Sequence, residues 1–230
     1  MIRPLTWPAS EFHDTISPIP NVRARMRKST SVMTKEGNSE NRAPASFYTI
    51  GHSTHPLEDF IALLRHYGVT MVADIRAFPY SRRNRDYDGA RLLPELAAQG
   101  IGYAHIPPLG GRRPRSKTVP PEVNAFWRVQ SFHNYADHAL GEDFHGGLET
   151  LIDMGRQATV AIMCAEILWW RCHRRIVTDY LLADGLKVLH ILSMTDATPA
   201  GLTPAAVVAA GPSITYPLPS ARQRDTGDES

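Results

Sequence analysis

Both cysteines of the chain lie in one short segment, CAEILWWRCHRR, at residues 164–175. A carboxylate, a histidine and three arginines lie among or beside them. Cys172 is expected near the start of a helix, and a helix N-terminus with neighbouring cations favours the nucleophilic thiolate. Cys164 ends an apolar stretch, where a cysteine is ordinarily a small core residue. The segment therefore predicts a thiol site, with Cys172 as the stronger candidate.

A metal site would use the same side chains. Cys164, Cys172, His173 and His52 can be assembled into a ligand set, but the Cys-x7-Cys-His spacing matches none of the zinc patterns with short paired knuckles. We therefore expect no metal. A thiol nucleophile needs a base within hydrogen-bond reach. His173 follows Cys172 directly, and on a helix its side chain would point about 100° away, so His52 is predicted to be the base.

Strands and helices alternate along the part of the chain that must hold these residues. Short apolar or β-branched runs predict five strands, at residues 47–50, 69–76, 101–107, 159–166 and 187–192. Helical patterns lie between them, at residues 55–68, 88–100, 122–140, 144–156 and 172–184. Strands that are apolar on both faces pair in parallel, so we expect an α/β fold. The expected architecture is Rossmann-like: a mostly parallel sheet of about five strands, flanked by helices.

One α/β domain is expected, at residues 46–193. Residues 1–45 lack a sustained apolar period, and residues 194–230 turn to small and polar residues, so both are predicted to be largely disordered tails. No stretch approaches the roughly 20 apolar residues of a membrane span, and the N-terminus lacks the order of a signal peptide. Two cysteines do not suggest a secreted disulfide scaffold, so we expect a cytoplasmic protein that does not bind membranes.

Polar clusters follow four of the predicted strands. In open parallel sheets, ligands bind outside the carboxyl ends of the strands, so these clusters are expected to converge. The residues predicted to be catalytic are Cys172, His52, Cys164, Glu166 and Asp74. The residues predicted to bind substrate are Ser53, Arg76, Ser81, Arg82, Gly110, Gly111, Arg112, His173 and Arg174.

Each cluster also has a structural interpretation. Ser53 or Thr54 can simply cap the following helix. Asp74 and Arg76 are two positions apart on a strand, so they point the same way and form either a structural ion pair or an anion-binding pair. The loop LGGRRPRSK is either solvated or binds phosphate, because paired glycines let backbone N–H groups approach an anion and arginines bind it bidentately.

Four ordered motifs carry a family resemblance. The stretches TIGHST, VADIRAFPYSRR, YAHIPPLGGRR and MCAEILWWRCHRRIVTDYLL, the last followed by VLHI, together resemble the domain of unknown function 488 family. The resemblance runs from Tyr48 to Ile191. It implies an α/β fold with a parallel sheet and a shared polar site at the positions above, with Gly51 and Pro79 included. It implies no activity, substrate or cofactor.

Three functions are compatible with these patterns. The first is a thiol-dependent enzyme whose phosphate- or carboxylate-bearing substrate is held by Arg76, Arg82 and Arg174. The second is a nucleic-acid or nucleotide-binding module that uses arginines 76, 82, 83, 85, 112, 113 and 115, with Tyr80, Tyr87 and Trp127 for stacking. The third is a protein-interaction adaptor, in which one of the adjacent Trp169 and Trp170 faces outward.

Overall fold

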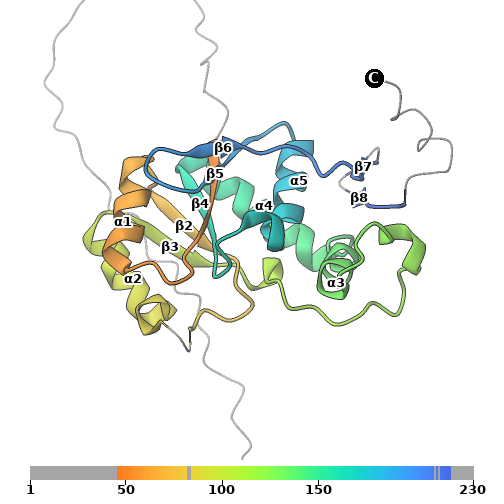
Figure 1. The fold of residues 1–230 in the computed structure, drawn as a ribbon, viewed down its shortest axis with the longest axis horizontal. Helices are drawn as coiled ribbons and strands as arrows, with labels where there is room; N and C mark the ends of the chain where they lie inside the picture. Colours follow the sequence, from red (N-terminus) through yellow and green to blue (C-terminus); the bar gives the residue numbers. More distant parts are fainter. Residues whose placement is uncertain (1–45, 82–83, 210, 212, 219–230) are drawn as a thin grey trace, which may run out of the picture. The chain divides into compact units, whose positions relative to one another are not determined.

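In the described residues, strands alternate with helices as predicted, and six of the strands form a sheet of order β3-β2-β4-β1-β5-β6 (Figure 1). The computed structural model describes residues 46–81, 84–209, 211 and 213–218. Five strands are parallel and β6 is antiparallel to β5, so the predicted α/β class and mostly parallel sheet are confirmed. The strands are β1 (Ser46–Gly51), β2 (Met71–Asp74), β3 (Gly102–His105), β4 (Val160–Cys164), β5 (Lys187–Ile191) and β6 (Ala197–Pro199).

Five α-helices connect the strands in the described residues: α1 (Leu57–His66), α2 (Gly89–Ala98), α3 (Gln130–His138), α4 (Glu142–Gln157) and α5 (Arg174–Ala183). Short 3-10 turns lie between them: η1 (Arg85–Tyr87), η2 (Pro107–Leu109), η3 (Pro121–Asn124) and η4 (Trp169–Arg171). The helix predicted at 122–140 is divided into η3 and α3. Between them the chain turns so that Trp127 packs into the core against Phe132 and Tyr216. None of the described helices is long and apolar enough to cross a membrane.

Helices cover both faces of the sheet. Helices α1 and α2 pack on one face and α4 and α5 on the other (Figure 1). Ala161 and Met163 of β4 belong to the core cluster of the first face, and Val160 and Ile162 belong to that of the second. Every residue of β4 is therefore buried, which explains the continuous apolar run of its sequence.

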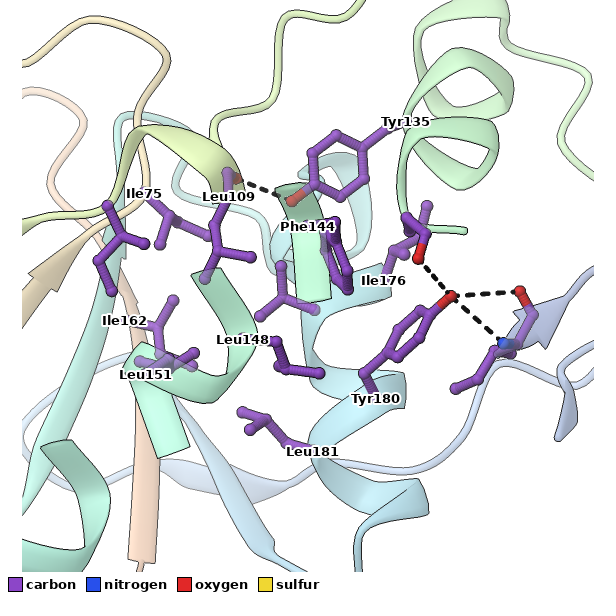
Figure 2. Packing of buried hydrophobic residues seen from close by; sticks show 14 of the residues in the cluster. Ile75, Leu109, Tyr135, Phe144, Leu148, Leu151, Ile162, Ile176, Tyr180 and Leu181 are labelled. Carbon is purple, nitrogen blue, oxygen red and sulfur yellow. Dashed lines mark hydrogen bonds between the residues drawn. The ribbon is translucent and has the colours of Figure 1, made fainter. Parts of the chain in front are cut away.

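The core on the α4 and α5 side includes buried tyrosines whose hydroxyls are paired. Figure 2 shows Leu148 and Tyr180 among the apolar side chains of this face. The hydroxyl of Tyr135 donates to the carbonyl of Leu109 (2.8 Å), and that of Tyr180 donates to the carbonyl of Ala139 (2.9 Å) (Figure 2). Because a buried hydroxyl needs a partner, these contacts tie η2 and the end of α3 to the core.

The packed part of the chain extends beyond residue 193, where the sequence places the domain boundary. Strand β6 pairs with β5, and a separate antiparallel pair is formed by β7 (Val207–Val208) and β8 (Ile214–Thr215). Tyr216 is buried, and its hydroxyl donates to Oδ2 of Asp179 (2.9 Å). Isolated apolar residues in a stretch rich in proline and glycine have no period, so the pattern does not reveal this packing. The tail predicted at 1–45 lies outside the described residues, as do residues 219–230 of the tail predicted at 194–230.

The strand order leaves a crevice beyond the carboxyl ends of β1 and β4. These strands are adjacent and parallel, with Gly51 opposite Cys164 at their carboxyl ends. Helix α1, which follows β1, packs on one face of the sheet, and α5, which follows β4, packs on the other. Where successive helices leave in opposite directions, the strand ends are left uncovered and a binding site can form.

The packing of α4 on the sheet predicts opposite effects for two glycine substitutions in that helix. A Cβ atom at Gly155 would lie 2.0 Å from Cζ of the fully buried Phe47, whereas one at Gly146 would meet nothing within 4 Å. We expect Gly155→Ala to lower the free energy of unfolding by about 1–3 kcal/mol, because the ring cannot move aside. The control, Gly146→Ala, should raise it by about 0.5–1 kcal/mol. Urea denaturation measures both, and an equal effect of the two variants would contradict this packing.

Candidate functional site

A cleft of about 710 Å³ lies at the carboxyl ends of the parallel strands. The predicted site residues that line it are His52, Ser53, Arg76, Ser81, Gly111, Arg112, Cys164, Glu166, Cys172 and His173. Three further predicted residues, Asp74, Gly110 and Arg174, are buried and do not line it. Arg82 lies outside the described residues. The clusters thus converge as the sheet rule requires, although their members have different surroundings.

Arg174 is a buried cation next to Cys172. Its side chain is 1 % exposed, and its Nε donates to Sγ of Cys172 at 3.3 Å. Its Nη2 donates to the backbone carbonyls of Glu166 and Ile167. Among the described residues, no carboxylate lies within 4.0 Å of this guanidinium. A buried charge is strongly unfavourable without an opposite charge, so the Cys172 thiolate is the natural counter-charge.

The two cysteines have opposite electrostatic character. Burial raises the pKa of Cys172, but a hydrogen bond from the Cys164 thiol and the proximity of His173 and Arg174 outweigh it and hold that pKa well below its usual range. The same hydrogen bond and burial hold the pKa of Cys164 well above its usual range. These opposite shifts favour the thiolate at Cys172 and the protonated thiol at Cys164.

His173, rather than His52, is in contact with the thiol. Its Nδ1 lies 3.5 Å from Sγ of Cys172, and its Nε2 donates to the carbonyl of Ile75 (2.9 Å). Since a carbonyl only accepts, Nε2 carries a hydrogen and Nδ1 is left to exchange a proton with the thiol. The sequence argument for His52 assumed a helical offset between residues 172 and 173. Cys172 instead precedes α5 in an extended conformation (φ −123°, ψ 146°), so that offset does not apply.

His52 forms a neutral wall of the cleft. Burial, followed by the nearby Arg76 guanidinium, lowers its pKa to about 4. Its Nδ1 donates to the carbonyl of Ser53 (3.1 Å), and its Nε2 faces Nη1 of Arg76 at 3.4 Å. The ring stacks on Tyr87 with 4.0 Å between centroids. His52 therefore contributes an uncharged ring to the cleft at neutral pH.

Asp74 and Arg76 form a buried ion pair. Nη2 of Arg76 lies 2.6 Å from Oδ2 of Asp74, and its Nε donates to Oδ1 at 2.9 Å. The hydroxyl of Tyr103, on β3, donates to the same Oδ2 (2.7 Å). Both oxygens of Asp74 are thus occupied, so the carboxylate holds Arg76 in place from behind the cleft. Tyr103 was not among the predicted site residues, because only the pairing of β2 with β3 brings it to Asp74.

The glycines of the basic loop are required by protein contacts. A Cβ atom at Gly111 would lie 2.3 Å from Nδ1 of His173, and one at Gly110 would lie 2.8 Å from Cα of Ala77. Arg113 donates to the carbonyls of this loop and braces it. Arg112, in contrast, is exposed and lines the cleft, so it is free to meet a ligand.

The turn after β1 fits closely against the chain after β4. A Cβ atom at Gly51 would lie 2.1 Å from the carbonyl oxygen of Glu166, so only glycine fits. Ser53 has φ 42°, in the left-handed region that non-glycine residues avoid at a cost of roughly 1–3 kcal/mol. It does not cap α1, whose N-cap is Pro56 without a side-chain hydrogen bond. Such strain is common where a backbone turn shapes a binding site.

Two exposed aromatic residues, Phe78 and Tyr80, line the cleft, and only Tyr80 was predicted from the sequence to stack on a ligand. Phe78 and Tyr80 are 51 % and 53 % exposed, with ring centroids 5.7 Å apart, and the Arg112 guanidinium lies 6.0 Å from the Phe78 ring. Tyr87 and Trp127, expected to stack on bases, are instead buried. The spacing of two aromatics in the loop AFPYS was the available signal.

The two tryptophans of the opening segment differ as expected. Trp170 is 44 % exposed, whereas Trp169 stacks on the buried His190 with 4.0 Å between centroids. Both lie in η4, between the two cysteines. Trp169 therefore anchors this turn to β5.

One group in the described residues has the composition of a metal site. Cys164, Cys172 and His173 each offer a ligand atom, and the three atoms lie within 4.8 Å of one another. The sequence predicts no metal because the spacing is unusual, but the fold assembles these ligands regardless. The Arg174 charge, 3.3 Å from Cys172, opposes a divalent cation there. Glu166 does not belong to the group, and its Oε1 accepts from the backbone N–H of Leu168 (3.2 Å).

The low pKa of Cys172 predicts an unusual pH profile for its alkylation. The thiolate persists wherever the pH exceeds that lowered pKa, so its rate with iodoacetamide should change little between about pH 7 and pH 9. Free cysteine, with a pKa of about 8.5, should accelerate steeply over the same range. Mass spectrometry of the labelled peptides gives both rates. A Cys172 rate that rises in parallel with free cysteine would exclude a stable thiolate.

Neighbouring arginines provide a matched pair of variants for this profile. Arg174→Gln removes the cation beside the thiolate and should raise the pKa of Cys172, so the pH at which alkylation reaches half of its maximal rate should move up by about one unit. Arg175→Gln should leave that midpoint unchanged, because Arg175 donates to Thr203 and lies over Trp127. Near-UV circular dichroism checks that both variants are folded, and equal midpoints would contradict the role of Arg174.

Comparison with known proteins places this site in a family. No curated protein and no solved structure matches the chain. Residues 56–181, more than half of the chain, match the sequence profile described as domain of unknown function DUF488. The matched region includes α1, β2 to β4, all but the last two residues of α5, and every cleft residue except those of the turn after β1. The chain therefore belongs to the DUF488 family.

Proposed function

We propose that this protein is a thiol-dependent enzyme, in which the Cys172 thiolate attacks an electrophilic centre of an anionic substrate. The observation that carries the proposal is the contact between Cys172 and the buried guanidinium of Arg174 at the edge of an open cleft. A thiolate is the nucleophilic form of cysteine. A thiolate paired with a buried cation is present before any substrate arrives.

The surrounding residues have distinct roles in this proposal. His173 is placed to take up or return a proton, through the Nδ1 that faces Cys172. Cys164 donates to the thiolate, and the Asp74–Arg76 pair with His52 forms the rigid wall opposite. A nucleophilic thiol requires a reducing compartment, so a cytoplasmic location belongs to the same proposal.

An anionic substrate is favoured by the charges of the cleft. In the described residues, three arginines line it, at positions 76, 112 and 171, against a single carboxylate, Glu166. The charge of Arg76 is neutralised by Asp74, whereas Arg112 and Arg171 are exposed. These two arginines are therefore the groups proposed to hold the phosphate or carboxylate of the substrate.

Paired alkylating reagents test this proposal without knowledge of the substrate. Iodoacetate and iodoacetamide react with the same thiolate, but only iodoacetate is anionic. We expect the ratio of their rates at Cys172 to exceed the ratio for free cysteine by roughly tenfold at low salt, as cationic clefts concentrate anions. The excess should shrink with added salt, which screens exposed charges.

Two arginines of the same loop allow a controlled comparison. Arg112→Gln should lower the iodoacetate preference several-fold, whereas Arg115→Gln should not, because Arg115 is exposed but does not line the cleft. A ratio equal to that of free cysteine in the wild-type protein would defeat the anionic-substrate proposal. Mass spectrometry that locates the label identifies any contribution from Cys164.

The exposed aromatic pair favours a second candidate function, nucleotide binding. Phe78 and Tyr80 present half-exposed rings at the cleft, with Arg112 beside them. Exposed aromatics next to a cation suit a ligand that has a planar base and a phosphate. A thiol enzyme and a nucleotide-binding protein can share this cleft, so the second candidate also describes a possible form of the substrate.

Binding of adenosine monophosphate tests this candidate. A combined Phe78→Ala and Tyr80→Ala variant should weaken binding by roughly tenfold, because stacking contributes about 1–3 kcal/mol per base. Leu93→Ala, an exposed residue of α2, is the control and should have no effect. Isothermal titration calorimetry gives the affinities. A thymidine oligonucleotide that binds when the mononucleotide does not, with a steep dependence on salt, would indicate a nucleic-acid interface instead.

A further inference from the structure

Two free cysteines from different elements meet at the cleft. Cys164 ends β4, and Cys172 lies in the turn between η4 and α5. Their sulfur atoms lie within 4.8 Å of each other, and both residues line the cleft. A thiolate and a thiol in this arrangement have the composition of a redox pair, in which one sulfur is oxidised first and the other resolves it.

The two sulfurs must approach further to form a disulfide. A disulfide needs a sulfur–sulfur distance of about 2.05 Å, so one side chain must move. Cys164 is held in the sheet, where β4 pairs with both β1 and β2. Cys172 lies outside the sheet, between η4 and α5, so we expect its side chain to make this movement.

We propose that Cys172 and Cys164 form a reversible disulfide when a peroxide enters the cleft, with Cys172 oxidised first and Cys164 as the resolving thiol. The proposal shares with the proposed function only the thiolate, and it is independent of the substrate.

Each step of this reaction balances. The Cys172 thiolate attacks one oxygen of the peroxide, so a sulfur–oxygen bond forms, the oxygen–oxygen bond breaks, and the departing hydroxide or alkoxide takes a proton to leave as water or an alcohol. Cys164 then loses its proton and attacks the sulfur of the sulfenic acid. The sulfur–sulfur bond forms and the hydroxyl leaves as water. The two sulfurs lose two electrons in total, and the peroxide gains them.

The oxidised form would lack the charge that pairs with Arg174. A disulfide is neutral, so the guanidinium would retain only the carbonyls of Glu166 and Ile167 as partners. The nucleophile of the proposed enzyme would be absent as well. Oxidation would therefore inactivate the site reversibly, until a dithiol reductant restores the thiolate.

Hydrogen peroxide and mass spectrometry test the proposal on the full-length protein. After brief exposure and rapid alkylation of the remaining thiols, we expect a peptide pair that is linked through residues 164 and 172, has lost two hydrogens, and is separated by dithiothreitol. Cys164→Ser should instead accumulate sulfenic acid at Cys172, which dimedone traps. Cys172→Ser should leave Cys164 unoxidised at the same peroxide concentration.

Two outcomes would overturn the redox pair. In the first, peroxide leaves both thiols open to alkylation. In the second, it oxidises Cys172 to sulfinic acid as fast in the wild type as in Cys164→Ser. Either result excludes Cys164 as the resolving residue. Circular dichroism of the two variants separates such a result from misfolding, and the wild-type peptide map is informative without any variant.

The proposed function and the redox pair fail in different measurements. Formation of the disulfide without a preference for iodoacetate would leave the redox pair standing and remove the anionic substrate. Rapid alkylation of Cys172 with that preference, but without a disulfide, would support the anionic substrate and exclude the redox pair.

Discussion

The buried charge of Arg174 is the constraint on which the site depends. This guanidinium is almost fully enclosed, and in the described residues it donates to two backbone carbonyls and to the sulfur of Cys172. The carbonyls are dipoles, so the thiolate is the group that can neutralise it. The same carbonyl of Glu166 lies against Gly51, which therefore must be glycine. One cation is thus enclosed by three segments that pack together: the turn after β1, the turn after β4 and the start of α5.

A second buried cation in the cleft has the opposite character. Arg76 is enclosed as well, but Asp74 binds it at two positions and Tyr103 completes the carboxylate. Its charge is neutralised locally, and the adjacent His52 stays uncharged because its pKa is lowered to about 4. This side of the cleft is neutral, whereas on the other side the Arg174 guanidinium favours the thiolate form of Cys172. The contrast explains why two arginines in similar burial have different chemical consequences.

Strand order explains why the reactive residues lie where they do. Helices α1 and α5 leave adjacent strands toward opposite faces of the sheet, and the ends of β1 and β4 are left open between them. Cys164 and His52 occupy those ends, and Cys172 is brought back by η4, which Trp169 anchors on His190. Residues of four connections therefore meet in one cleft, although the chain between them forms ordinary core.

The amino-acid sequence by itself determined the α/β class, the order of the elements and the location of the site. The period of the apolar residues and the glycines that end helices are local properties of the chain. The carboxyl ends of parallel strands share one edge of the sheet by geometry alone. The tertiary structure decided the roles. Whether His52 or His173 meets the thiol, whether Asp74 faces a ligand or Arg76, and whether Cys164 touches Cys172 depend on side-chain positions across elements. The same holds for Tyr216, which is buried although the sequence beyond residue 193 has no apolar period that predicts packing.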